Sequence, residues 1–276
     1  MSERFEIKVK DFDLAETLEC GQCFNFKKAD DDFYNVTAFG RVLHVGQKED
    51  NLIFDDTTEE EYKSVWEDYF DLAADYGMIK EIIKENSPEL SDIIEKNSGI
   101  RIMKQDFFET LISFIISQNK QIPQIKQVIG MLSESYGERY KDSFLFPTPE
   151  SLLAAGEDGI RKCKAGFRAP YITDAVTKYI NGEISEKILS GLDTDSAREK
   201  LMTIKGVGPK VANCVLLYSL HRIESFPVDV WMKRIMEELY FHKDTDKKVI
   251  ESFAAEKFGR YSGIAQQYLF IYAKEK

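Results

Sequence analysis

Two ionisable residues, Lys210 and Asp229, stand where this sequence best supports covalent chemistry. Lys210 follows the letters GVGP, in which two glycines allow a tight turn and a proline suits the first position of a helix. Asp229 lies shortly after, in FPVDVWM. Backbone N–H groups in such a turn and at a helix N-terminus can hold a phosphate. A lysine amine can act as a nucleophile, and a carboxylate can stabilise positive charge that develops during a reaction.

Each of these two residues also has a plainer explanation. Lys210 could bind a phosphate as a charged side chain rather than attack a substrate. Asp229 suits the N-cap position of a helix, where its carboxylate accepts backbone N–H groups. The two explanations of Asp229 are compatible, because a capping carboxylate is held rigidly and can still act on a neighbouring charge.

The elements that must position these groups begin with a small sheet. Residues 5–10 alternate apolar and polar, as a half-buried strand does. Four short segments rich in aromatic and β-branched residues follow, at 24–26, 33–39, 41–47 and 52–54. We therefore expect residues 1 to about 55 to form an antiparallel sheet.

From residue 57 onward the hydrophobic period becomes helical. Residues 107–118 are apolar nearly all round, which predicts a buried central helix. Further helices are expected up to residue 131, after Thr148 as N-cap, over 169–180, after the glycine turn, from Asp229, and over 261–274. The predicted fold class is α+β, with an antiparallel-sheet domain and flanking helices over 1–100. A mainly helical region follows over 101–276, with its hairpin at about 201–220.

The net charge of −11 on 276 residues argues against a general-purpose nucleic-acid binder. Three segments nevertheless contain no acidic residue and two to four basic ones: 117–133, 161–168 and 203–220. If they meet on one face, an acidic protein still has a basic groove. The alternative is that they are separately solvated loops.

The four cysteines are too sparse for a disulfide scaffold and indicate a reducing, intracellular setting. Cys20 and Cys23 form a C-x-x-C, which we interpret as two ordinary thiols near a turn. No apolar run approaches the ~20 residues that span a bilayer, and no signal peptide is visible. We expect no membrane association and a cytoplasmic location, close to the nucleoid if the source is prokaryotic.

Several motifs give the chain a family resemblance. These are GVGPKVANC at 206–214 with FPVDVWM at 226–232, CGQCF at 20–24, YFDL at 69–72, QD at 105–106, ISQN at 116–119, GFRA at 166–169 and GIAQ at 263–266. Together they resemble the 8-oxoguanine DNA glycosylase/AP lyases of the helix–hairpin–helix GPD superfamily of base-excision DNA glycosylases. The resemblance spans nearly the whole chain. It implies a monomer that acts on damaged double-stranded DNA and needs no organic cofactor.

The resemblance assigns the chemistry to Lys210 and Asp229. Lys210 would attack C1′ of the sugar, release the base and form a Schiff base that permits strand cleavage by β-elimination. It must be uncharged to attack, and the positive end of a helix dipole favours the uncharged form of an amine. Asp229 would stabilise the positive charge that develops on the sugar and orient the amine.

Recognition of the damaged base falls to four residues in the same resemblance. A carbonyl at Gly21 would accept a hydrogen bond from N7–H, which 8-oxoguanine has and guanine lacks. Gln266 would read the Watson–Crick edge of the flipped base, Phe270 would stack on it, and Cys214 would line its pocket. Gly21 could also be a simple turn glycine. Without the resemblance we would prefer a small core residue for Cys214, a solvated polar residue for Gln266 and a core aromatic for Phe270.

Contacts with the rest of the duplex would come from the loops. Asn119 matches a residue that fills the vacated space, Phe167 a wedge, and Arg168 an arginine that contacts the orphaned base. Gly206 and Gly208 would hold a phosphate through the hairpin.

The chain departs from the best-known eukaryotic members at two positions. Gln124 stands where they have a second arginine, so we expect a relaxed preference for the base opposite the lesion. Trp231 replaces a histidine that contacts phosphate, which puts that contact in doubt.

Hairpins of this kind can hold a monovalent or calcium cation through carbonyls, here those of Met202, Ile204 and Val207, although the sequence fixes no metal. Two rival functions remain open. An alkylated-base glycosylase of the same superfamily would typically lack the hairpin lysine, whereas a non-catalytic hairpin adaptor would bind DNA regardless of damage.

Overall fold

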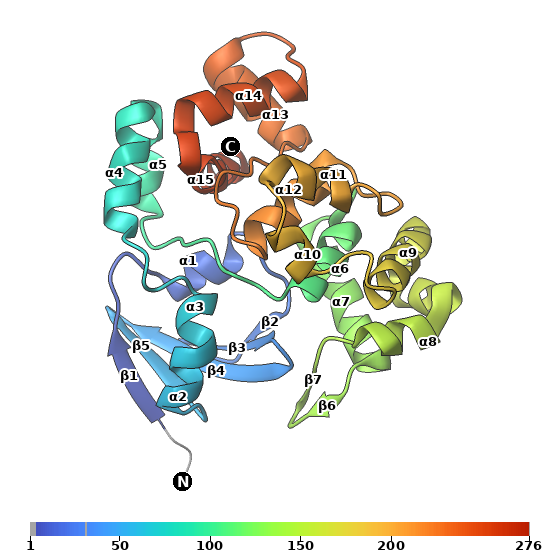
Figure 1. Cartoon of the computed structure of the whole chain (residues 1–276). Coiled ribbons are helices and arrows are strands. Elements are labelled where there is room, and N and C mark those ends of the chain that lie inside the picture. The colour runs from blue at the N-terminus through green and yellow to red at the C-terminus, as the bar shows by residue number, and fades with distance from the viewer. Residues whose placement is uncertain (1–3, 31, 276) are drawn as a thin grey trace.

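The computed structural model describes residues 4–30 and 32–275 and confirms the α+β class. A five-stranded antiparallel sheet lies at one end of the molecule, and helices form the rest (Figure 1). The strands are β1 (Arg4–Lys8), β2 (Phe26–Lys28), β3 (Phe33–Ala38), β4 (Arg41–Lys48), β5 (Asn51–Asp55), β6 (Arg139–Tyr140) and β7 (Ser143–Phe144).

The α-helices of the described chain are α1 (Leu14–Glu19), α2 (Glu59–Glu61), α3 (Glu67–Tyr69), α4 (Tyr76–Asn86), α5 (Ser91–Lys96), α6 (Phe107–Ser117), α7 (Ile122–Tyr136), α8 (Pro149–Ile160), α9 (Ala169–Ile180), α10 (Glu186–Ser190), α11 (Thr194–Leu201), α12 (Pro209–Tyr218), α13 (Val230–Met236), α14 (Lys247–Phe258) and α15 (Ser262–Glu275). Six short helical turns complete the list: η1 (Tyr62–Trp66), η2 (Pro88–Leu90), η3 (Arg161–Ala165), η4 (Gly166–Arg168), η5 (Glu237–Phe241) and η6 (Gly259–Tyr261).

The sheet has the strand order β1-β5-β4-β3-β2, so β2 to β5 form a meander and the N-terminal strand pairs with the last one. Its apolar residues pack in a core of their own with Trp66 and Phe70, which come from η1 and the turn after α3. The short strands β6 and β7 form a hairpin outside this sheet.

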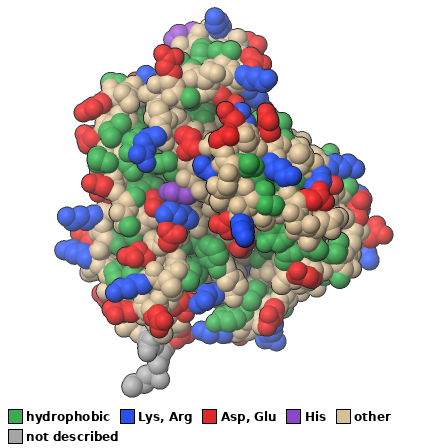
Figure 2. All heavy atoms as spheres, viewed as in Figure 1, with side chains coloured by type: hydrophobic (Ala, Val, Ile, Leu, Met, Phe, Trp, Pro, Cys, Tyr) green, Lys and Arg blue, Asp and Glu red, His purple; other side chains and the backbone are tan. Residues whose placement is uncertain are grey.

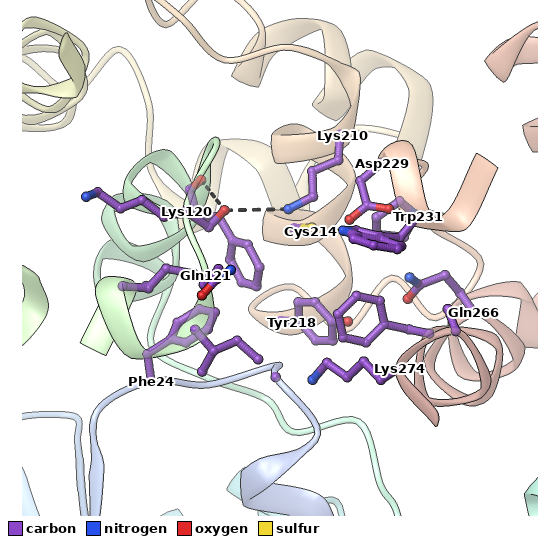
Figure 3. Close-up of a pocket in the computed structure, with 18 of the residues that line it drawn as sticks. Phe24, Lys120, Gln121, Lys210, Cys214, Tyr218, Asp229, Trp231, Gln266 and Lys274 are labelled. Carbon is purple, nitrogen blue, oxygen red and sulfur yellow. Dashed lines mark hydrogen bonds between the residues drawn. The ribbon is translucent and has the colours of Figure 1, made fainter. Parts of the chain in front are cut away.

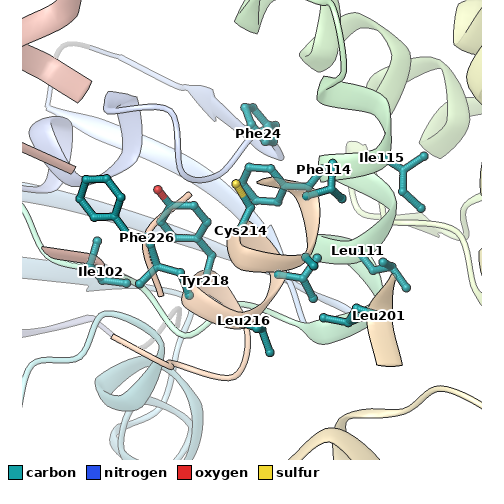
Figure 4. Packing of buried hydrophobic residues seen from close by; sticks show 14 of the residues in the cluster. Phe24, Ile102, Leu111, Phe114, Ile115, Leu201, Cys214, Leu216, Tyr218 and Phe226 are labelled. Atoms are coloured by element: carbon teal, nitrogen blue, oxygen red, sulfur yellow. The ribbon is translucent and has the colours of Figure 1, made fainter. Parts of the chain in front are cut away.

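A second and larger core joins the helices. At its centre α6 packs against α12, and Phe114 and Tyr218 stack with ring centroids 5.3 Å apart (Figure 4). Nine of the eleven residues of α6 are buried, which confirms the predicted central helix. The helices α4 and α5, which we expected within the first domain, share this second core and contact α14 and α15.

Buried polar contacts tie the two cores together. The Arg101 guanidinium is buried, and it donates to the carbonyls of Lys10, Asp11, Asp71 and Ala74. One side chain therefore holds the chain that leaves β1 against the turn between α3 and α4. In the part of the chain that the structure describes, no helix is long and apolar enough to cross a membrane.

Candidate active site

The turn before Lys210 contains two glycines, of which the first is sterically constrained and the second is not. Gly206 has a positive φ of 76°, and a Cβ built there would lie 2.3 Å from the ring of Tyr171. Only glycine fits that position without displacing the ring. Gly208 is the N-cap of α12 and has open space around it.

The N-terminus of α12 differs from those of most longer helices in the described chain. Asp106, Thr148, Asp193 and Asp246 cap α6, α8, α11 and α14 with their side chains. The glycine N-cap of α12 has no side chain, and Pro209 occupies its first turn. The N–H groups at this end are therefore left for an external acceptor such as a phosphate.

The hairpin is docked on α9 by an ion pair. The carboxylate of Asp174 accepts the backbone N–H of Lys205 at 2.7 Å and pairs with the ammonium of Lys178 at 3.0 Å. That ammonium also donates to the carbonyl of Thr203. The segment that leads into the turn is thus fastened to α9.

Lys210 lies in the first turn of α12 and is half-buried. Its ammonium lies 3.5 Å from the hydroxyl of Ser117 and 5.2 Å from the ring centroid of Phe114, both on α6 (Figure 3). The amine therefore projects into the space between α12 and α6 and meets no described carboxylate within ion-pairing distance.

Asp229 caps α13, as its sequence position predicts. Its Oδ1 accepts the N–H of Met232 at 2.7 Å. The segment before it is held against the lysine helix, because the Asn213 amide of α12 donates to the carbonyl of Phe226. The carboxylate is consequently fixed in direction while it faces the same cavity as Lys210.

One cavity of about 640 Å³ collects the two predicted catalytic residues and the four predicted base-binding residues. It is lined by Gly21, Phe24, Phe114, Ser117, Lys120, Gln121, Ile122, Pro123, Ile125, Lys210, Cys214, Tyr218, Pro227, Asp229, Trp231, Gln266, Phe270, Ala273 and Lys274. These residues come from the N-terminal loop, α6, α7, α12, α13 and α15, so the site requires segments distant in sequence to pack around the larger core.

The Gly21 loop is held by its neighbour Gln22, which is fully buried. The Gln22 side chain donates to the carbonyls of Thr17 and Arg101 and accepts the N–H of Met103. Gly21 itself has φ 98°, and a Cβ there would meet the side chains of Ile122, Lys274 and Phe270 at 3.1–3.4 Å. The lack of a side chain thus serves both the backbone conformation and the open cavity.

The far wall of the cavity is α15. Gln266 and Phe270 are four residues apart and share one face. Gln266 is 5% exposed, and its Oε1 is buried without a hydrogen-bond partner. The N1–H and 2-amino groups of a guanine are donors, so this unpaired acceptor suits the Watson–Crick edge that we predicted it to read.

Cys214 lies one turn after Lys210 and is buried. Burial raises the pKa of its thiol, and the nearby Lys210 ammonium only partly opposes that effect. The thiol is therefore neutral at pH 7 and forms an apolar wall. Cys20 and Cys23 are also buried free thiols, as their isolated motif predicted.

A second hollow, of about 1220 Å³, continues the first along the surface and shares Ser117, Lys120, Lys210, Asp229 and Trp231 with it. Asn119 lines it from the loop after α6, in the left-handed conformation with φ 52°. Asparagine tolerates that conformation better than most residues, which accounts for its place at this loop tip.

Phe167 and Arg168 lie beside this hollow without lining it. Phe167 is 49% exposed, as a wedge must be, and the Arg168 guanidinium lies 4.2 Å from its ring centroid. Arg168 is buried and donates to the carbonyls of Gln118 and Ala165. To contact an orphaned base it must first leave these carbonyls.

The three basic segments adjoin one another, as the groove hypothesis requires. Arg168 joins the second segment to the first through Gln118, and Lys210 joins the third to the first through Ser117. Burial and then the charges of Arg168 and Lys164 lower the pKa of Lys120. Elsewhere acidic and basic side chains are interspersed, as on the face in Figure 2.

Sequence reasoning missed several cavity residues. Phe114, Tyr218 and Lys274 line the cavity without having been predicted there, and Phe24 had no role of its own although it belongs to the CGQCF motif. Phe114 carries no signal, because aromatic residues in buried helices usually belong to a core. Tyr218 could have been found, since it continues the four-residue spacing of Lys210 and Cys214 on α12. Lys274 could have been found, since it continues the four-residue spacing of Gln266 and Phe270.

No cluster of three or more His, Cys, Asp or Glu side chains suited to a metal occurs among residues 4–30 and 32–275. A hairpin cation would use carbonyls instead. Of the three candidates, Ile204 already accepts the N–H of Val207 at 3.0 Å. The proposed ligands Met202, Ile204 and Val207 stay a prediction.

Comparisons with known proteins agree with this geometry. Residues 4–111 match the 8-oxoguanine DNA glycosylase N-terminal domain, and residues 112–260 match the HhH-GPD superfamily base excision DNA repair proteins. A "Probable N-glycosylase/DNA lyase" of Methanothermobacter thermautotrophicus is 29% identical over 245 residues, which are 79% of this chain and 75% of that protein.

Two solved structures are more similar still. MBOgg1 in complex with a low affinity DNA ligand is 46% identical, with a TM-score of 0.95 over 99% of this chain and 96% of that one. The 8-oxoguanine glycosylase/lyase of Clostridium acetobutylicum, bound to dsDNA containing cytosine opposite to 8-oxoG, is 40% identical. Its TM-score is 0.94 over 100% of this chain and 98% of that one.

Proposed function

Because this chain belongs to the 8-oxoguanine DNA glycosylase family of the HhH-GPD superfamily, we propose that it excises 8-oxoguanine from duplex DNA and then cleaves the strand as an AP lyase. The observation that carries the proposal is the meeting of Lys210, Asp229 and Gly21 around one cavity. These residues are far apart in the sequence and come from the loop after α1, from α12 and from the start of α13.

The cavity suits a flipped purine. Gly21 and Phe270 are neighbours in its wall, and Gln266 lies one turn before Phe270. Lys210 and Asp229 also line the second hollow, so they lie where the two spaces meet. A base that enters from the duplex brings its sugar carbon C1′ toward the amine, while the carbonyl of Gly21 is available to N7–H of 8-oxoguanine. Guanine offers a lone pair at N7 and is repelled there.

In the reaction the uncharged amine of Lys210 forms a bond to C1′ as the bond from C1′ to N9 breaks. The bonding electrons leave with the base, and the Asp229 carboxylate stabilises the positive charge on the sugar. The sugar ring then opens: the bond from C1′ to O4′ breaks, O4′ takes a proton from the nitrogen, and the nitrogen forms a double bond to C1′, which gives a protonated Schiff base. Removal of a C2′ proton then expels the 3′ phosphate, which is β-elimination.

The helix N-terminus beside Lys210 supports DNA binding through a phosphate. Its uncapped N–H groups and the hollow next to it face the same side as Asn119. We propose that Asn119 fills the space left by the flipped base, that Phe167 wedges the stack, and that Arg168 contacts the orphaned base. Gly206 and Gly208 shape the turn that meets the phosphate.

We also propose that the protein works as a monomer, because all six proposed catalytic and base-binding residues line one cavity of a single chain.

The decisive experiment uses duplexes with one 8-oxoguanine opposite each of the four bases. Lys210→Gln should lower base release by at least about 10³-fold, the scale of losing a covalent nucleophile, and abolish borohydride trapping. The control is Lys63→Gln, which removes the same charge from an exposed position that lines neither cavity and should keep both activities.

Other outcomes separate the rivals. Damage-independent binding with no strand nicking by the wild type would indicate a DNA-binding adaptor. Release of alkylated bases without trapping would indicate an alkylated-base glycosylase. Since Gln124 replaces an arginine, excision rates opposite the four bases should be similar, and a strong preference for cytosine would contradict that part of the proposal.

A further inference from the structure

A second lysine, Lys274, lies at the base end of the cavity, where the functions above leave it without a role. It is on α15, one turn after Phe270 and two turns after Gln266, so the three side chains form one stripe. Figure 3 shows Lys210 and Lys274 at opposite ends of the cavity, with Cys214 and Tyr218 between them. The cavity thus has a cation near the sugar and another near the base.

The contacts of Lys274 place its ammonium beside Gly21. The Nζ donates to the carbonyl of Cys20 at 3.3 Å and lies 4.6 Å from the ring centroid of Phe270. It would lie 3.3 Å from a Cβ built on Gly21. A purine that stacks on Phe270 and turns N7 toward Gly21 therefore presents its O6 and O8 edge to this ammonium.

The charge of Lys274 is not compensated inside the cavity. No described carboxylate lies within 4 Å of its ammonium, and Asp229 is at the other end. Burial raises the pKa of the adjacent Cys20 thiol to about 11, so that group is neutral at pH 7. Burial also lowers the pKa of Lys274, and a negative partner would oppose that shift.

We propose that Lys274 donates a hydrogen bond to an oxygen on the O6 and O8 edge of the flipped base and stabilises the negative charge that the base acquires as it leaves. When the bond from C1′ to N9 breaks, the electron pair spreads from N9 over the ring and its oxygens. The ammonium keeps its protons. The departed base takes one proton from solvent, and the matching positive charge remains on the protonated Schiff base at Lys210.

This assignment rests on the proposed excision of 8-oxoguanine, and it differs from the role of Gly21. A carbonyl at Gly21 distinguishes the damaged base before the reaction. An ammonium that pairs with charge present only during bond cleavage lowers the barrier instead. The plainer explanation is that Lys274 only ties the end of α15 to the Cys20 carbonyl.

Two variants and two substrates separate these explanations. Lys274→Met keeps most of the length of the side chain without its charge, and Lys274→Arg keeps the charge. We expect Lys274→Met to slow single-turnover excision by roughly 10- to 100-fold with little change in KM, in the range of losing one such donor. Lys274→Arg should stay within a few-fold of the wild type.

The second substrate is a duplex with a preformed abasic site. It has no base to leave, so Lys274→Met should cleave it at the wild-type rate. Equal loss on both substrates would show a structural role and overturn the proposal, as would an unchanged excision rate. If the wild type cleaves abasic sites but excises no 8-oxoguanine, the proposed function fails instead.

A third readout is the dependence of rate on the leaving base. In the wild type, excision of purines with increasingly acidic N9–H groups should speed up only modestly. In Lys274→Met the same series should show a steeper slope, because poor leaving groups need the cation most. Parallel slopes would contradict the proposed contact.

Discussion

Asp229 illustrates how one side chain can satisfy the fold and the site together. Its Oδ1 caps α13 through the N–H of Met232, while the residue lines the cavity with Lys210. The helix end holds the carboxylate in place and also favours its negative charge. The two sequence-based explanations of this residue are thus compatible in the structure.

Because Asp229 has these two roles, one substitution can remove its charge while keeping its helix cap. Asparagine caps helices as well as aspartate does, so Asp229→Asn should leave the melting temperature nearly unchanged. It removes the negative charge, and base excision should fall by about 10²-fold or more. Single-turnover excision and thermal unfolding measure the two effects.

Asp229→Ala is the comparison, since it removes the cap and the charge together. It should lose about 1 kcal/mol of stability in addition to activity. Full excision activity in Asp229→Asn would rule out an electrostatic role for this carboxylate.

At the scale of residues, the sequence analysis predicted the site residues that belong to a recognisable motif. Lys210, Asp229, Gly21, Cys214, Gln266 and Phe270 were all expected at the site, and they line one cavity. Their individual roles stay predictions. Phe114 could not be predicted, because its side chain reaches the site only through the packing of α6 against α12.

At the scale of elements, the hairpin depends on α9 as much as on its own glycines. Tyr171 fills the space where a side chain at position 206 would project, and Asp174 binds the backbone of Lys205. The two glycines of the turn therefore have separate functions. One is required by packing, and the other leaves the helix end open.

Substitution by alanine should separate these functions. Gly206→Ala has to displace the ring of Tyr171 and holds an unfavourable φ, so the free energy of unfolding should fall by about 1–3 kcal/mol. The methyl group of Gly208→Ala meets nothing within 4 Å, so its free energy of unfolding should stay close to that of the wild type.

Gly208→Ala should instead lower the affinity for DNA, because its methyl group enters the space in front of the α12 N–H groups. Thermal unfolding and titration with abasic-site duplex measure the two quantities. Weakened folding in Gly208→Ala with unchanged affinity would contradict this division of roles.

The sequence predicted helices and strands correctly where the segment was long enough for its hydrophobic periodicity to be recognised. The helix over residues 169–180, the N-cap at Thr148 and the central helix α6 are confirmed. The six-residue helix α1 and the two-residue strands β6 and β7 were missed, since segments so short establish no period. Helix α1 lies within the region that we expected to be sheet alone.

At the scale of the whole molecule, a net charge of −11 coexists with three adjoining segments that contain basic residues and no acidic ones. The contacts of Arg168 and Lys210 bring the three basic segments together, which no sequence pattern could establish. An acidic protein gains little from general attraction to DNA, so its affinity should rest on a few lysines and arginines at this surface.

We therefore expect DNA affinity to depend only weakly on salt concentration. Replacing a single lysine at the DNA-binding surface should change that dependence measurably. Lys120 lines both cavities, and Lys120→Ala should reduce the slope of log K against log salt by about 1. Lys63, an exposed lysine on η1 that lines neither cavity, is the control and should leave the slope unchanged. Equal slopes for wild type and Lys120→Ala would place the DNA elsewhere.

The stripe of side chains on α15 has a consequence for how such a scaffold can acquire new specificities. Gln266, Phe270 and Lys274 recur every four residues on a single terminal helix, whereas the nucleophile and its carboxylate belong to α12 and the start of α13. Contacts to the flipped base can therefore vary separately from the nucleophile and its carboxylate, although Lys274 itself takes part in the proposed bond cleavage. Gln266 and Phe270 could be exchanged to admit a different lesion while Lys210 and Asp229 act on the sugar as before.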